Sequence, residues 1–106
     1  MLVTTDEVDE IRKEKGEREL RLLLIVERSE WHLPKALWLF QEKLNAYASF
    51  ILDGKMRSLY PWADPKDVRI VVQSHGQAPQ VALEAIEKAN AVLAADGPVI
   101  SFEQVE

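Results

Sequence analysis

The segment from Leu20 to Val26, with the sequence LRLLLIV, constrains the fold of this chain most strongly. It is too short for a typical helix, and nearly every position is apolar or branched, as in a strand that is covered on both faces. We therefore expect a central strand here. The segment from Val68 to Gln73 has the same character, because alternate positions would place Val71 on the face opposite to its apolar neighbours.

A hairpin is expected at the start of the chain. Gly16 lies between Val8 to Lys13 and Arg18 to Glu27, so these two segments would pair with the first strand at an edge of the sheet.

Two helices and a last strand complete the pattern. A first helix begins near Pro34, ends near Gly54, and has apolar residues at steps of three and four. A second helix begins near Pro79 and ends at Asp96-Gly97, and Val99 to Val105 alternates as a half-covered strand does. The expected core positions of the first helix are Leu37, Phe40, Leu44, Tyr47, Ala48 and Ile51.

The order of these elements predicts an α+β protein. Strands joined through a helix favour parallel pairing, so we expect a two-layer α/β sandwich, with a β-hairpin followed by helix, strand, helix and strand. The sheet would be mixed and four-stranded, with two main helices. A chain of 106 residues has room for a single domain, residues 1–106, in which residues 1–7 are expected to form a flexible arm.

Two helices cannot easily cover both faces of such a sheet. Either they lie on opposite faces and leave each thinly covered, or they share one face and the other packs against a second copy. The apolar character of both faces of Leu20 to Val26 favours a homodimer. Aromatic and apolar residues beside the core stripe of the first helix and near its ends either anchor contacts or seal the core. The candidate interaction surface is Trp38, Leu39, Phe50 and Trp62.

Composition excludes several classes of function. The net charge of -5 opposes binding to nucleic acid or to an anionic membrane. No apolar run is longer than that from Leu22 to Val26, which is far shorter than the roughly 20 residues of a membrane span. The absence of cysteine excludes thiol catalysis and disulfides. Because the first residues also lack the pattern of a secretory signal, a cytoplasmic protein is expected.

One candidate ligand site follows from the strand order. The carboxyl ends of parallel strands are where ligands tend to bind, and Glu27, Ser29, Ser74 and His75 would gather there. These groups are sufficient for acid–base chemistry, although any strand-to-helix loop is polar. No histidine spacing suggests a metal site, and the four glycines are isolated, so neither a metal nor a nucleotide cofactor is expected.

The stretch from Phe40 to Tyr47, with Phe50-Ile51, Gly54, Tyr60-Pro61 and the earlier Glu30-Trp31, resembles a family of small bacterial proteins with a domain of unknown function. The helix of that family is similar to LQEKINAYLxFIESG, and the resemblance covers about residues 8 to 105. The chain departs from it at 32–34, where His-Leu-Pro replaces charged residues, and at Leu52-Asp53, which replaces a Glu-Ser pair. The resemblance implies a hairpin-first topology and no particular reaction.

The favoured hypothesis is a non-catalytic protein-interaction module that self-associates. A small-molecule-binding protein or enzyme with a site near His75 is an alternative. A second alternative is an immunity-type protein that neutralises a basic toxin, a role that suits a small acidic domain.

Overall fold

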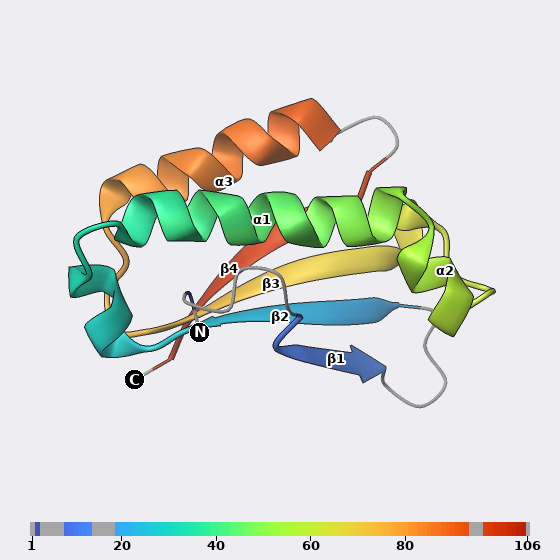
Figure 1. Ribbon diagram of the computed structural model, residues 1–106, viewed down its shortest axis with the longest axis horizontal. Coiled ribbons are helices and arrows are strands. Elements are labelled where there is room, and N and C mark those ends of the chain that lie inside the picture. Colours follow the sequence, from blue (N-terminus) through green and yellow to red (C-terminus); the bar gives the residue numbers. More distant parts are fainter. Residues whose placement is uncertain (1, 3–7, 14–18, 94–96, 106) are drawn as a thin grey trace.

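The computed structural model describes residues 2, 8–13, 19–93 and 97–105. Four strands and two long helices form the body of the protein, and shorter helical turns connect them (Figure 1). In chain order the elements are β1 (Glu10–Lys13), β2 (Leu20–Val26), η1 (Arg28–His32), α1 (Ala36–Leu52), α2 (Lys55–Leu59), η2 (Pro65–Asp67), β3 (Val68–His75), α3 (Gln80–Leu93) and β4 (Val99–Val105).

The strands form one mixed sheet in the order β1-β2-β3-β4. The hairpin strands β1 and β2 are antiparallel, whereas β2 with β3 and β3 with β4 are parallel, as connections through a helix require. The predicted α+β architecture, with a hairpin followed by helix, strand, helix and strand, is therefore confirmed.

Both long helices lie on the same face of this sheet (Figure 1). Alternate residues of the two central strands point toward them and are fully or almost fully buried, because successive side chains of a strand face opposite ways. The core joins these residues to the apolar stripe of α1; its members include Leu22, Leu24, Phe40, Leu44, Tyr47, Ile51, Ile70 and Val72. The sequence left two arrangements of the helices open, and the observed one places no described helix on the second face of the sheet.

The ends of the helices follow local chemistry. Helix α1 is followed by Gly54, whose φ of 85° lies in the left-handed region that glycine adopts at little cost. Helix α3 starts directly after Pro79 and ends at Leu93, whose carbonyl accepts a hydrogen bond from Gly97 N–H at 2.8 Å. The expected last turn at residues 94–96 lies outside the described residues.

Most of the expected flexible arm, residues 1 and 3–7, also lies outside the described residues. Leu2 is described, and its side chain is fully buried in the core. Its backbone N–H donates to Glu30 Oε2 at 2.6 Å, so at this residue the chain is tied to the domain.

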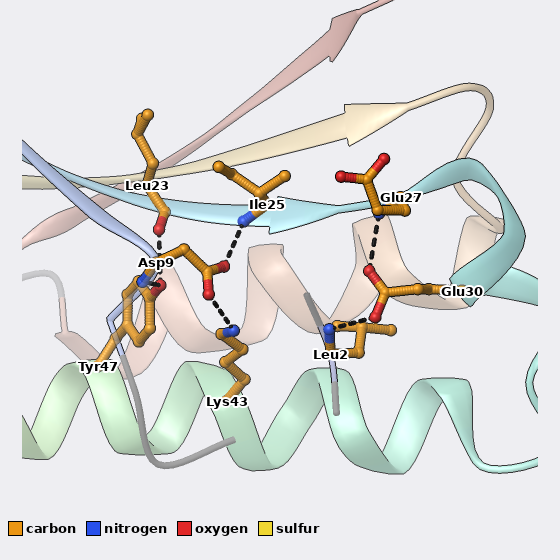
Figure 2. A network of polar contacts seen from close by, with 8 residues as sticks. All are labelled: Leu2, Asp9, Leu23, Ile25, Glu27, Glu30, Lys43 and Tyr47. Carbon is orange, nitrogen blue, oxygen red and sulfur yellow. Dashed lines mark hydrogen bonds and ion pairs between the residues drawn. The ribbon is translucent and has the colours of Figure 1, made fainter. Parts of the chain in front are cut away.

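A charged residue lies inside the helix layer, which the apolar periodicity of α1 did not predict. Lys43 is completely buried, and its ammonium group lies 2.6 Å from Asp9 Oδ1, just ahead of β1 (Figure 2). The other carboxylate oxygen of Asp9 accepts the backbone N–H of Ile25 at 2.8 Å. The ion pair thus joins the edge of the hairpin to the central helix.

Tyr47 lies one turn further along α1 and completes the same network (Figure 2). Its hydroxyl donates to Leu23 carbonyl at 2.6 Å and accepts the N–H of Asp9 at 2.8 Å, so it bridges the two hairpin strands where their direct pairing ends. Burial raises the pKa of Tyr47, which keeps the hydroxyl protonated as a donor. The motif residues Lys43 and Tyr47 therefore have a structural explanation.

We expect Lys43→Met to lower the free energy of unfolding by about 3–5 kcal/mol, because it leaves the Asp9 carboxylate buried without this cation. Urea denaturation measures the change. The double variant Asp9→Asn, Lys43→Met should recover part of the loss, since an Asn side chain is neutral and can still accept the Ile25 N–H.

The matched control is Lys88→Met on the exposed side of α3, which should change stability by no more than about 0.5 kcal/mol. Equal stability of the Lys43 and Lys88 variants would show that the buried ion pair does not hold the hairpin.

Candidate functional site

The structure does not direct all four predicted ligand-site side chains to one face of the sheet, because Ser74 and His75 are successive residues of β3. Glu27 and Ser29 are exposed at the end of β2 and in η1. Ser74 is fully buried on the helix side of β3, whereas His75 is the next residue of the strand and points to the opposite face. Sequence reasoning placed both residues in one loop after the strand, but β3 continues to His75, and strand alternation separates their side chains.

The Ser74 hydroxyl has a structural role. It accepts a hydrogen bond from Trp31 Nε1 at 2.8 Å and donates to the carbonyl of Gly76 at 2.9 Å. The Trp31 ring also meets Phe40 edge-on, with centroids 5.4 Å apart. These contacts hold η1 over the end of the sheet.

A hollow of about 560 Å³ lies beside this contact, at the carboxyl ends of the central strands. We call it the strand-end hollow, and its lining residues are Arg28, Trp31, His32, Gln77, Ala78, Pro79 and Gln80. It has the location that the sequence predicted for a ligand, but none of the four predicted residues lines it. In the described part of the chain, no three His, Asp or Glu side chains gather as a metal site would require.

Glu30 organises the turn below this hollow (Figure 2). Its Oε1 accepts the N–H of Glu27 at 2.9 Å and its Oε2 accepts the N–H of Leu2 at 2.6 Å. Partial burial alone would raise the pKa of Glu30, but the hydrogen bonds from Glu27 and Leu2 outweigh it and lower this pKa below 4.5. The carboxylate therefore acts as a cap for the backbone.

The four residues of the predicted interaction surface do not form one patch. Trp38 is 56% exposed, whereas Leu39 and Phe50 are half-buried and pack against the core. Trp38 and Phe50 are also separated by about 18 Å along α1. Trp62 lies in the loop before η2, where Lys13 Nζ is 5.4 Å from its ring.

The side of the sheet opposite to the helices carries side chains from all four strands, and we call it the open face. Leu23 and Val71 lie at its centre and are only 3% and 7% exposed, although no described layer covers them. The longer side chains around them supply this shielding, and part of the face is hollowed, with a volume of about 310 Å³. The open-face residues are Glu10, Arg12, Arg21, Leu23, Ile25, Arg69, Val71, Gln73, His75, Val99, Ser101, Glu103 and Val105.

An arginine row crosses one end of the open face. Arg12, Arg21 and Arg69 lie side by side because they occupy matching positions in β1, β2 and β3. Acidic side chains balance them: Glu10 lies 3.1 Å from Arg12, and Glu19 lies 3.1 Å from Arg21 and 3.7 Å from Arg69. The sequence did not predict this row. The alternation of side chains along a strand indicates which face of the sheet each arginine occupies, but the three become neighbours only through the pairing register of the strands.

The lowered pKa of Glu30 gives a testable pH dependence. Its contribution to stability is present above the ordinary pKa of 4.5 and is lost as the pH falls through the lower pKa of the folded state. Glu30→Gln should cost roughly 1 kcal/mol at pH 7 and flatten the loss of stability below pH 4.5, as followed by thermal unfolding. Glu42→Gln, on the exposed side of α1, is the control. Parallel pH curves for the Glu30 variant and the unaltered protein would contradict this account.

Of the described helices, none offers the length and apolar character that crossing a bilayer demands.

Comparisons with known proteins add one finding. The chain matches, over residues 1–106, a family described as "Family of unknown function (DUF6572)". Neither a curated protein nor a solved structure matches it. The match spans every element described above and agrees with the resemblance to a domain of unknown function. The chain therefore belongs to the DUF6572 family.

Proposed function

We propose that this protein is a non-catalytic protein-interaction module that binds a second copy of itself through the open face. The observation that carries the proposal is the placement of α1 and α3 on one side of the sheet (Figure 1). The other side has an apolar centre, Leu23 and Val71, under a shell of longer polar side chains, and the apolar residue Val99 is 55% exposed beside them. A second copy would pack on this shell and on Val99, as the helices pack on the opposite face.

The distribution of charge supports a second copy as the partner. The whole chain has a net charge of -5, so two copies repel each other over most of their surfaces. On the open face the three arginines are balanced by Glu10, Glu103 and the adjacent Glu19. Two copies can therefore approach each other there without the repulsion that acts elsewhere.

The positions of these charges also suggest an orientation. The arginine row lies at one end of the parallel strands, and Glu103 lies two rows further along, beside Gln73. A two-fold axis that crosses the strands would bring the arginine row of each copy over the Glu103 row of the other. Such isologous contacts are the commonest way in which identical chains associate.

Charge reversal tests this proposal. Arg69→Glu should weaken dimerisation by about tenfold or more, because it places a carboxylate over the row that holds Glu103 of the second copy, one strand away from it. Glu103→Arg should weaken it for the converse reason, and the double variant should restore most of the affinity. Sedimentation equilibrium measures the dimer constant of each variant.

Lys88→Glu, on the exposed side of α3, makes the same change in net charge as Arg69→Glu and should leave the dimer constant unchanged. Circular dichroism verifies that each variant is folded. Dimerisation of the folded Arg69 variant with the affinity of the unaltered protein would contradict the proposed interface.

The strand-end hollow favours a second candidate function, the binding of a small polar ligand. Arg28 and His32 offer cationic and hydrogen-bonding groups there, and the Trp31 ring offers an apolar wall. Isothermal titration with inorganic phosphate tests this candidate. Binding that Arg28→Ala abolishes would support it, and no heat at millimolar phosphate would count against it.

With either function, the protein would act in the bacterial cytoplasm, because a chain without cysteine needs no oxidising environment.

A further inference from the structure

Strand β4 forms one edge of the sheet, and its hydrogen-bonding groups differ along its length. At Ile100 the side chain of Asn90, from α3, occupies the outer edge: Asn90 Nδ2 donates to Ile100 carbonyl and Asn90 Oδ1 accepts Ile100 N–H, each at 2.8 Å. The Asn90 amide thus makes the two bonds that a neighbouring strand would make. Pairing of another strand at Ile100 is blocked.

The same bonds establish which way the rest of β4 faces. Backbone groups of alternate residues point to the same edge of a strand, so Phe102 and Gln104 direct their N–H and C=O groups outward, as Ile100 does. Val105 faces inward, since its carbonyl accepts Gly76 N–H from the neighbouring chain segment at 3.0 Å. Within the described residues, no further strand lies beyond β4, so this edge offers two donors and two acceptors.

At the opposite edge of the sheet, the length and charge of β1 disfavour pairing with another chain. Strand β1 has only four residues, and three of them are charged: Glu10, Arg12 and Lys13. Natural sheets prevent unwanted pairing with short, charged edge strands of this kind. Strand β4 has seven residues, VISFEQV, with Glu103 as its single charge. Among the described residues, a side chain closes β4 at the Ile100 position alone, and that side chain is Asn90.

We propose that the outer edge of β4 at Phe102 and Gln104 binds an extended segment of another protein by strand addition, with a basic residue of that segment beside Glu103. Main-chain hydrogen bonds supply the affinity in such complexes, and alternate side chains supply the specificity. Glu103 is exposed on the open-face side of this edge, where a Lys or Arg of the added strand would meet it. Asn90 limits the pairing to the part of β4 beyond Ile100.

Charge argues against a second copy as the occupant of this edge. Within the described residues, two β4 strands that pair antiparallel through both Phe102 and Gln104 place Phe102 of each opposite Gln104 of the other. This register puts the Glu103 carboxylates of the two copies directly opposite each other, and like charges so placed are destabilising. A register centred on Phe102 would need the outward backbone groups of Ile100, which already bond to Asn90. These charges favour a different chain with a basic residue as the partner.

Synthetic peptides test the proposal, with NMR titration of the ¹⁵N-labelled protein as the readout. The probe is acetyl-Thr-Val-Lys-Val-Thr-amide, whose valines would face the helix side of the sheet and whose lysine would lie beside Glu103. We expect selective shifts of the Phe102 and Gln104 amide signals. A peptide with Glu in place of Lys should bind about tenfold more weakly, and Glu103→Lys should reverse this preference. A peptide with N-methylated valines should not bind, since it lacks the donors of a strand.

The Arg69→Glu variant separates this proposal from the proposed dimer, because that residue lies on β3, away from the outer edge of β4. We expect this variant to bind the peptide at least as tightly as the unaltered protein, because without the dimer Glu103 no longer faces the arginine row of a second copy. Asn90→Ala should free Ile100 and tighten the binding of a peptide longer by two residues, and Asn45→Ala, on exposed α1 surface, is its control. No response of the β4 amides at millimolar peptide, or equal binding of all three peptides, would overturn the proposal.

Discussion

A four-stranded sheet has two faces to bury, and the described residues of this chain form two long helices with which to bury them. Both helices pack on the same face, so their combined apolar surface completes one core, with residues such as Leu22, Phe40 and Ile70 at its centre. Among the described residues nothing equivalent covers the other face. Its small apolar centre, Leu23 and Val71, is shielded by the long side chains around it. The proposed function begins from this imbalance between the two faces.

The two edges of the sheet are stabilised by different means. At β1 a buried ion pair, Lys43 with Asp9, and the Tyr47 hydroxyl connect the hairpin to α1 and fix where its pairing ends (Figure 2). At β4 the Asn90 amide satisfies one residue of the edge and leaves the next outward groups to solvent. Side chains of α1 therefore make polar contacts at the β1 edge, and a side chain of α3 does so at the β4 edge. These contacts determine which backbone groups of each edge strand can still pair with another strand.

Much of the fold could be predicted from the sequence because the periodicities of two and of 3.6 residues are clear. The strand Val99–Val105 and the start of α3 after Pro79 illustrate this, and Gly54 marked the end of α1 through its backbone freedom. Lys43 was harder to place, since periodicity assigns a lysine to the solvent, and its burial is compensated by an ion pair with Asp9, 34 residues away in the chain.

The candidate sites were less predictable because they depend on register and on strand length. Extension of β3 by two residues beyond Gln73 turned Ser74 inward and His75 outward, which separated the predicted ligand-site residues. The arginine row depends on the pairing of β1 with β2 and of β2 with β3, which no local pattern of residues records.

The association state of the unaltered protein tests the central claim most directly, because the open face either binds a second copy in solution or does not. The measurement is the molar mass by multi-angle light scattering over a wide range of protein concentrations and at moderate ionic strength. If two copies associate through the open face, the mass rises with concentration to twice that of one chain and then remains constant. The mass of a single chain at every concentration, up to the millimolar range, would contradict the claim.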